Sequence, residues 1–199
     1  MSTPRSHPSP RGWHSRGYLP HFEAGDEVIQ SLTFRLADTL PRSLLEAWRN
    51  ELAVIESARR ETELRLRIER ELDAGCGPCW LADSQLADLV ENAMLHFDGE
   101  RYRLLAWVVM PNHVHALIQP FQDHSLSQIV GSWKSFTATL ANRYLGRVGR
   151  FWQADYFDRF IRDDVHYEQA KEYIEMNPVK AGLCDLPADW PWSSASRRK

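Results

Sequence analysis

The sequence predicts an α+β domain in which an open antiparallel sheet carries helices against one face. Strand patterns and helix patterns succeed one another along a chain of 199 residues, a length that suits one domain with its own core. Hydrophobic residues make up 43% of the chain and charged residues 26%, as in a globular protein. The apolar runs fall short of the roughly 18 to 20 residues that a membrane span needs, so no membrane association is expected.

The N-terminal sequence MSTPRSHPSPRGWHSRG is basic and has no apolar stretch behind it, so it does not resemble a secretory signal. Three cysteines cannot close a framework of disulfides. Both observations favour the cytoplasm. Residues 1–15, which are rich in Ser, Pro and Arg, are predicted to form a disordered arm, and residues 16–199 a single domain.

The first two predicted elements are a strand and a helical insertion. Alternation and β-forming residues predict a strand over Val28–Leu36. From Arg42 to Asp73 the charges nearly cancel, while apolar residues recur at helical spacing. This pattern predicts either a long amphipathic helix or a pair of helices.

A helix and two strands follow. Asp83 is a candidate N-cap for a helix that runs through Phe97 and is closed by Gly99. The nearly continuous apolar run Arg103–Met110 is typical of a central strand, and His113–Gln119 is predicted to be a second strand beside it.

The last third of the chain predicts helix, strand and helix. Ser125 opens a helix with one apolar stripe, and the aromatic-rich segment Phe151–Ile161 is extended. An aspartate at 163 or 164 caps the final helix. That helix is predicted to end at Asn177, because Pro178 disfavours helical geometry in the residue before it.

Two histidines on one predicted strand form the first candidate site. Successive side chains of a strand alternate between its faces, so His113 and His115 project the same way, with Cα atoms about 6.5 to 7 Å apart. Both could reach one divalent cation, while Val114 and Ala116 pack on the opposite face against the helices. The alternative is a pair of half-exposed strand histidines without a ligand.

The final helix offers a second cluster. Tyr173 and Asn177 lie four residues apart, hence one above the other on one helix face. A phenol with its ordinary pKa near 10 is a poor nucleophile at neutral pH unless its target is made more electrophilic. A cation on neutral histidines could do this for a phosphate, and histidine with amide oxygen suits Mg²⁺ or Mn²⁺. The residues therefore favour tyrosine-mediated phosphodiester cleavage. The alternative is a partly buried tyrosine and a helix-terminating asparagine.

The motif Cys76-Gly77-Pro78-Cys79 matches the redox motif of thioredoxins. That chemistry needs a strand before the motif and a helix N-terminus at its first cysteine. Here a predicted helix precedes the motif, and the next helix begins only near Asp83. The context favours a turn over a redox, metal or disulfide role.

Several segments resemble the REP-associated tyrosine transposases, single-tyrosine HUH enzymes akin to the IS200-type transposases. The resemblance runs from about residue 16 to residue 196. It rests on these segments in this order: RGYLPHF, TFRLADTLP, AWVVMPNHVHALIQP, FWQADYFDRFIRDDVHY, EYIEMNPVKAGL and DWPWSSA.

The resemblance implies an enzyme that nicks and joins single-stranded DNA with a metal ion, on a ferredoxin-like (RRM-like) scaffold. By position, His113 and His115 correspond to the HUH metal ligands, Tyr173 to the nucleophile and Asn177 to the third ligand. A 5′-phosphotyrosine intermediate and hairpin-forming repeats flanked by a short guide sequence are implied as well. The absence of a P-loop motif agrees with an exchange of esters that needs no nucleotide triphosphate.

Residues 134–162 hold six basic residues against two acidic ones, although the whole chain has a net charge of −3. This segment either attracts a polyanion or is an ordinary solvated surface. The expected phosphate contacts are Lys134, Arg143, Arg150 and Arg159, while Arg16 and Tyr18 are expected to read the guide sequence. We expect a monomer or a homodimer. The alternative function is a single-stranded nucleic-acid-binding module that does not cleave.

Overall fold

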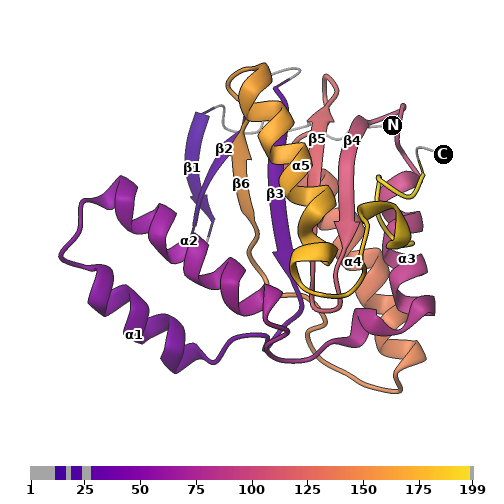
Figure 1. Cartoon of the computed structure of the whole chain (residues 1–199), viewed down its shortest axis with the longest axis horizontal. Coiled ribbons are helices and arrows are strands. Elements are labelled where there is room, and N and C mark those ends of the chain that lie inside the picture. Colours follow the sequence, from indigo (N-terminus) through magenta and orange to yellow (C-terminus); the bar gives the residue numbers. More distant parts are fainter. Residues whose placement is uncertain (1–11, 17–18, 24–27, 198–199) are drawn as a thin grey trace, which may run out of the picture.

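The computed structural model of the chain describes residues 12–16, 19–23 and 28–197. Its centre is a four-stranded antiparallel sheet with the strand order β4-β5-β3-β6 (Figure 1). The strands are β3 (Gln30–Arg35), β4 (Tyr102–Val109), β5 (His113–Pro120) and β6 (Phe157–Phe160). With α3 (Ser84–Leu95) and α4 (Leu126–Tyr144) they follow the ferredoxin-like succession βαββαβ. The predicted α+β class and antiparallel sheet are therefore confirmed.

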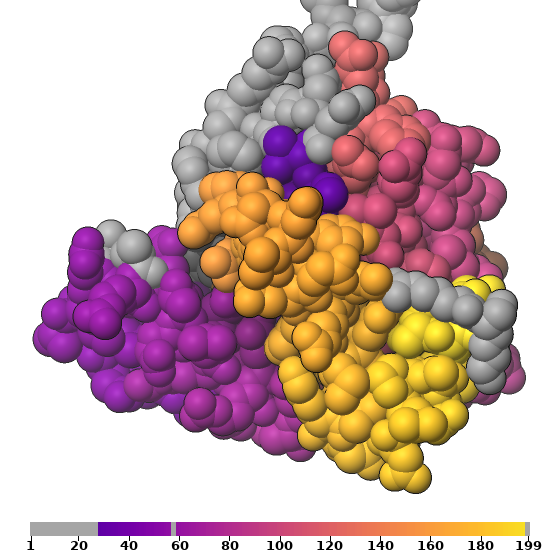
Figure 2. Space-filling model, turned by 45° about the horizontal axis from the view of Figure 1, so that its top comes forward, coloured from indigo at the N-terminus to yellow at the C-terminus, as the bar shows by residue number. Residues whose placement is uncertain are grey.

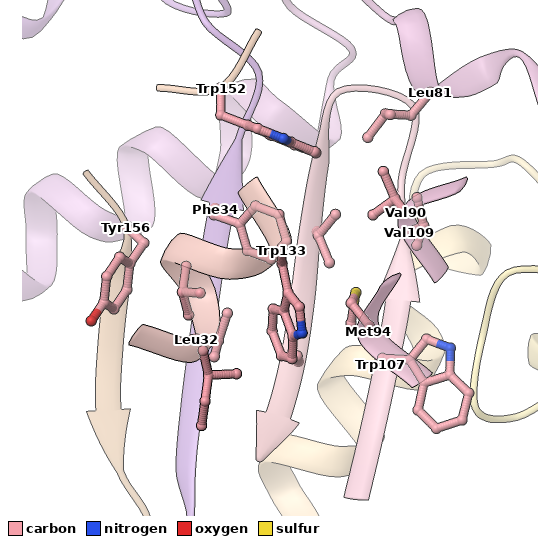
Figure 3. Close-up of a cluster of buried hydrophobic side chains, with 14 of the residues drawn as sticks. Leu32, Phe34, Leu81, Val90, Met94, Trp107, Val109, Trp133, Trp152 and Tyr156 are labelled. Atoms are coloured by element: carbon pink, nitrogen blue, oxygen red, sulfur yellow. The ribbon is translucent and has the colours of Figure 1, made fainter. Parts of the chain in front are cut away.

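The main core lies between one face of the sheet and helices α3 and α4 (Figure 3). Leu32 and Phe34 of β3 point into it, as do Val114 and Ala116 of β5, as expected. Trp133 donates its indole N–H to the hydroxyl of Tyr102 inside this core. Both helices begin at the predicted caps, because the side chains of Asp83 and Ser125 accept hydrogen bonds from the first turns.

The final helix, α5 (Asp164–Lys180), covers the opposite face of the sheet. There Ile174 packs with Ala106, Val108 and Leu117 of β4 and β5. The predicted packing of helices on one face holds for α3 and α4 and is wrong for α5. The nearly continuous apolar run of β4 indicated this arrangement, because a strand that is buried on both faces carries apolar residues on both sides.

The prediction that α5 ends at Asn177 was also wrong, because the helix continues through Pro178 to Lys180. Proline costs the helix one hydrogen bond and adds a steric clash, yet this last turn is tied down by two later bonds. The Ala181 N–H donates to the Asn177 carbonyl at 3.0 Å, and the Leu183 N–H donates to the Pro178 carbonyl at 2.9 Å. Asn177 thus lies inside the helix and does not terminate it.

The segment 42–73 forms a helical pair, α1 (Arg42–Leu52) and α2 (Ser57–Asp73), which resolves the two predicted alternatives. The pair has a small core of its own, formed by Leu40, Leu52, Leu64, Ile68 and Leu72. It projects to one side of the sheet beside α5, and the C-terminal end of α2 turns back to the sheet (Figures 1 and 2).

The predicted disordered arm is wrong for residues 12–15, which lie in a hairpin of β1 (Gly12–Arg16) and β2 (Leu19–Glu23). The partner strand supplies backbone hydrogen bonds that composition does not reveal. Residues 1–11 of the predicted arm lie outside the described residues. No described helix is both long and apolar enough to cross a membrane.

Two short 3₁₀ helices complete the fold, η1 (Trp80–Ala82) and η2 (Pro187–Asp189). The chain after η2 runs along the free edge of β4. There the Val109 N–H donates to the Trp192 carbonyl and the Ser194 N–H to the Trp107 carbonyl, each at 2.9 Å. The Trp190 indole N–H donates to the Val109 carbonyl and fixes this segment to the strand.

Candidate active site

The two histidines of β5 lie on the face of the sheet that α5 covers, side by side as predicted. His113 is fully buried and His115 is 2% exposed. Their Nε2 atoms are 2.9 Å apart and their rings meet edge to face. The alternative of half-exposed histidines is therefore wrong.

The tautomer of His113 follows from the hydrogen bonds of Asn112. The Asn112 side-chain N–H₂ donates to the carbonyls of Leu72 and Cys76, each at 3.0 Å. This fixes the amide so that its Oδ1 faces Nδ1 of His113 at 2.6 Å. An amide oxygen only accepts, so Nδ1 carries the proton and Nε2 presents a lone pair to His115.

The His115 ring is held from its other side. Its Nδ1 lies 2.7 Å from the hydroxyl of Thr33 on β3. Burial lowers the pKa of both rings, well below the ordinary value for His113 and to about 3 for His115, so both imidazoles are neutral. When the Thr33 hydroxyl accepts from Nδ1, two lone pairs face each other across 2.9 Å, an arrangement that a cation favours.

Asp73 and Asn177 border the same space. The Asp73 carboxylate lies 3.6 Å from Nε2 of His113, and the ligand atoms of Asp73, His113 and His115 all lie within 4.8 Å of one another. Asn177 is fully buried and interacts with Asp73. Among the described residues, neither polar atom of Asn177 nor Oδ1 of Asp73 has a hydrogen bond of normal geometry. Orphaned buried polar atoms beside paired imidazoles fit a bound cation.

Tyr173 completes the cluster one helical turn before Asn177. Its ring centroid lies 5.4 Å from that of His115, and the rings meet at 78°. Burial raises the pKa of the Tyr173 phenol, and the carboxylates of Glu69 and Asp73 raise it further. The hydroxyl is therefore protonated at neutral pH, and the Asn177 amide interacts with it.

A cleft of about 230 Å³ opens beside Tyr173 between α2, α5 and the strands β3 and β6. Arg65 and Glu69 of α2 line it, with Arg159 of β6 opposite. Glu69 is 7% exposed and accepts a hydrogen bond from Arg65 at 3.1 Å. Sequence reasoning missed Arg65, Glu69 and Asp73, whose only signal was their place in a charged helical segment.

The predicted DNA contacts are scattered. Arg159 lies in the cleft with Tyr173, whereas Arg150 is exposed and lines a second cleft of about 310 Å³ next to α1. Arg143 is exposed near the end of α4, the helix on the other face of the sheet. The side chain of Arg16 is not among the described ones, and Tyr18 lies outside the described residues.

The ammonium of Lys134 already has partners in the protein. It donates to the carbonyls of Gln153 at 2.6 Å and Ala154 at 2.8 Å, and burial lowers its pKa to about 8. Its place favours a role in holding the segment before β6 over the predicted contact with a phosphate.

We expect Lys134→Met to lower the free energy of unfolding by about 1 to 2 kcal/mol, because two carbonyls lose their donor. DNA affinity should not change. Urea unfolding measures the first effect and a fluorescence binding titration the second. Arg143→Met on the same helix is the control and should stay within about 0.5 kcal/mol of the wild type. A stable Lys134→Met variant with weakened DNA binding would restore the phosphate contact.

The Cys76-Gly77-Pro78-Cys79 segment is irregular, with a bend at Gly77 directly after the turn at residues 74–75. Gly77 has a φ of +78°, and a Cβ there would overlap the backbone of Thr39. Both thiols are free. The hydrogen bond to Glu71 raises the pKa of Cys76 and burial raises the pKa of Cys79, contrary to the lowered pKa of a redox cysteine. The Cys76 carbonyl instead holds Asn112, the residue that orients His113.

Comparisons with known proteins agree with this architecture. The sequence model described as "Transposase IS200 like" matches residues 83–177, a span from the cap of α3 to Asn177. A Haemophilus influenzae protein provisionally named as a REP-associated tyrosine transposase is 32% identical over 106 residues, or 48% of this chain. The Escherichia coli REP-associated tyrosine transposase is 27% identical over 111 residues, or 55% of this chain.

The alignments take in 60% and 64% of the length of these two relatives, respectively. Among solved structures, that of a REP-associated tyrosine transposase bound to a REP hairpin superposes with a TM-score of 0.54. It is 19% identical, and the match covers 92% of this chain and 82% of that one, which establishes a shared fold. Residues 83–177 are therefore similar to the IS200-like transposases, and the chain is similar in sequence and fold to REP-associated tyrosine transposases.

Proposed function

We propose that this protein is a transposase that cleaves and rejoins single-stranded DNA at hairpin-forming repeats through a covalent tyrosine intermediate. The observation that carries the proposal is the position of Tyr173 on α5, whose ring meets that of His115 beside His113 on β5, with Asn177 one helical turn further along α5. The relatives named as REP-associated tyrosine transposases, one of them bound to a REP hairpin, support the choice of DNA.

In the proposed reaction the Tyr173 oxygen attacks the phosphorus of a phosphodiester in the cleft. A bond forms between the phenolic oxygen and phosphorus, and the bond from phosphorus to the 3′ oxygen breaks. The phenol loses its proton, and the departing 3′ oxygen takes one up to become a hydroxyl. The DNA downstream stays attached as a 5′-phosphotyrosine, and the reverse reaction joins a strand without nucleotide triphosphate.

A divalent cation would be held by His113 and His115 together with Asn177, as the family resemblance implies. When bound, it would polarise the phosphate and stabilise the charge that develops in the transition state. Imidazole nitrogens bind Mn²⁺ more tightly than Mg²⁺, so Mn²⁺ should act at the lower concentration. Asn112 fixes the His113 tautomer with a lone pair on Nε2, and the Thr33 hydroxyl can hold the His115 ring in the same way by accepting from its Nδ1.

The test uses one hairpin oligonucleotide labelled in two ways, with Mn²⁺ present. A 3′ label should become attached to the protein and survive denaturing electrophoresis, while a 5′ label should appear in a shortened free strand. Binding without any adduct would support the alternative, a nucleic-acid-binding module that does not cleave. An adduct that carries the 5′ label would contradict the proposed polarity.

Arg159 should contact the DNA backbone near the reacting phosphate, because it lines the cleft beside Tyr173. We expect Arg159→Ala to weaken binding of a single-stranded hairpin oligonucleotide several-fold and to lower the salt dependence by about one counterion. Arg143→Ala removes the same charge on α4 and should change affinity less than twofold. Titrations at several salt concentrations measure both, and equal losses would contradict a localised contact.

Asn177 should contribute a weak, neutral ligand. We expect Asn177→Ala to raise the Mn²⁺ concentration for half-maximal cleavage more than it lowers the rate at saturating Mn²⁺. Glu172→Ala, at an exposed position on the same helix, is the matched control. Cleavage measured across a Mn²⁺ series decides the matter, because superimposable curves for wild type and Asn177→Ala would remove Asn177 from the site.

A further inference from the structure

We infer that the helical pair α1–α2 is part of the active site, because the last residue of α2, Asp73, supplies a charged ligand to the same cation. The inference rests on the proposed function for the use of the cation, but not for its binding. Nothing in residues 83–177, which match the transposase family, provides this carboxylate.

The distances suit a shared ion. Two ligands on one ion with bonds of about 2.1 Å are roughly 3.0 Å apart at adjacent octahedral positions and 4.2 Å apart at opposite ones. The two Nε2 atoms are 2.9 Å apart, and the Asp73 oxygen lies 3.6 Å from that of His113. One ion can therefore contact all three side chains after shifts of a few tenths of an ångström.

The lack of a hydrogen-bond partner for Oδ1 of Asp73 within the described part of the chain also supports a bound cation at this place. Its Oδ1 is buried next to His113 and has no hydrogen-bond partner among the described residues, although a carboxylate oxygen is a strong acceptor. His113 cannot donate a hydrogen bond to this oxygen, because its ring proton is on Nδ1 and is donated to Oδ1 of Asn112. A carboxylate oxygen and an imidazole lone pair repel each other unless a cation lies between them.

Asn112 fixes the distance between α2 and His113. One amide binds the Leu72 carbonyl, adjacent to Asp73, and the His113 ring at the same time. It also binds the Cys76 carbonyl, next to the bend at Gly77 that lies close against the Thr39 backbone. These bonds hold Asp73 at the imidazoles with no contribution from a ligand, so the helical pair is built into the site.

The charge of Asp73 gives the sharpest consequence. His113, His115 and Asn177 are neutral donors, and a carboxylate adds the negative charge that Mn²⁺ and Mg²⁺ prefer. Loss of the charge should therefore lower cation affinity strongly even when the shape of the side chain is preserved.

The experiment measures Mn²⁺ binding to the full chain without DNA, by electron paramagnetic resonance of free Mn²⁺. We expect one site in the wild type, a Kd at least about tenfold higher in Asp73→Asn, and no binding in His113→Ala. Glu61→Gln removes an exposed charge from the same helix and should stay within twofold of the wild type. Without Mn²⁺, Asp73→Asn should unfold at the wild-type temperature or above it.

A wild-type Kd for Asp73→Asn would overturn the inference, as would the absence of Mn²⁺ binding in the wild type. The adduct assay separates these failures from that of the proposed function. Adduct formation with unchanged Mn²⁺ affinity in Asp73→Asn leaves the transposase in place without this ligand. Tight binding that depends on Asp73, without any adduct, leaves the ligand in place without the reaction.

Discussion

Tyr173→Phe will abolish the covalent DNA adduct while leaving affinity for a hairpin oligonucleotide within a few-fold of the wild type. The substitution removes the nucleophilic oxygen and keeps the ring that packs edge to face against His115. Denaturing electrophoresis of a 3′-labelled strand measures the adduct, and a binding titration at matched salt measures affinity.

Tyr167→Phe is the control for this result, because Tyr167 lies on the same helix and packs against the same face of the sheet. It should form the adduct at close to the wild-type rate. Loss of the adduct in Tyr167→Phe, with retention in Tyr173→Phe, would move the nucleophile to Tyr167. Retention in both variants would argue against a tyrosine on α5 altogether.

His113→Ala will be inactive at every Mn²⁺ concentration, in contrast to a weakened ligand that excess metal can restore. The change deletes a central donor and leaves Oδ1 of Asn112 without its partner, so neither the cation nor its surroundings can be rebuilt. Cleavage across a Mn²⁺ series measures the effect, and circular dichroism verifies that the variant is folded. His96→Ala, at an exposed histidine, should match the wild type. Rescue of His113→Ala by excess Mn²⁺ would contradict a central role.

The parts of the site that repeat with the period of one element could be predicted from the sequence. His113 and His115 share a face because strands alternate, and Tyr173 and Asn177 stack because four residues make about one helical turn. Asp83 and Ser125 were predicted as helix starts for an equally local reason, the reach of a cap side chain to the next turn. In each case the cause and the effect lie within one element.

Asp73 and Glu69 could not be placed at the site in this way, because their position depends on where the chain returns to the sheet after a long helical segment. Within α2 they resemble the other charges of an exposed amphipathic helix, and only the turn held by Asn112 brings them to His113 and Tyr173. Lys134 shows a second limit of reasoning from the sequence. It was counted in a basic surface, but its ammonium is occupied by two backbone carbonyls that composition cannot reveal.

The placement of α5 was missed for a related reason. Its apolar residues do not form one clear stripe, because the face with Tyr173 and Asn177 must be polar where it meets the histidines. A helix whose buried face carries polar functional side chains shows only a weak apolar periodicity in its sequence. Pro178 led to the wrong prediction that α5 ends at Asn177. Its tendency to end a helix is overridden by the hydrogen bonds of the following turn.

The segment along the edge of β4 has a consequence for how copies of this protein meet one another. An uncovered edge strand offers a row of unpaired N–H and carbonyl groups to any strand of a neighbouring molecule, and so invites aggregation. The segment with Trp190, Trp192 and Ser194 uses these groups, and its two indoles bind the Val109 carbonyl and Asp88. The motif DWPWSSA, which is remote from the histidines, thereby blocks the pairing of β4 with a strand of another molecule.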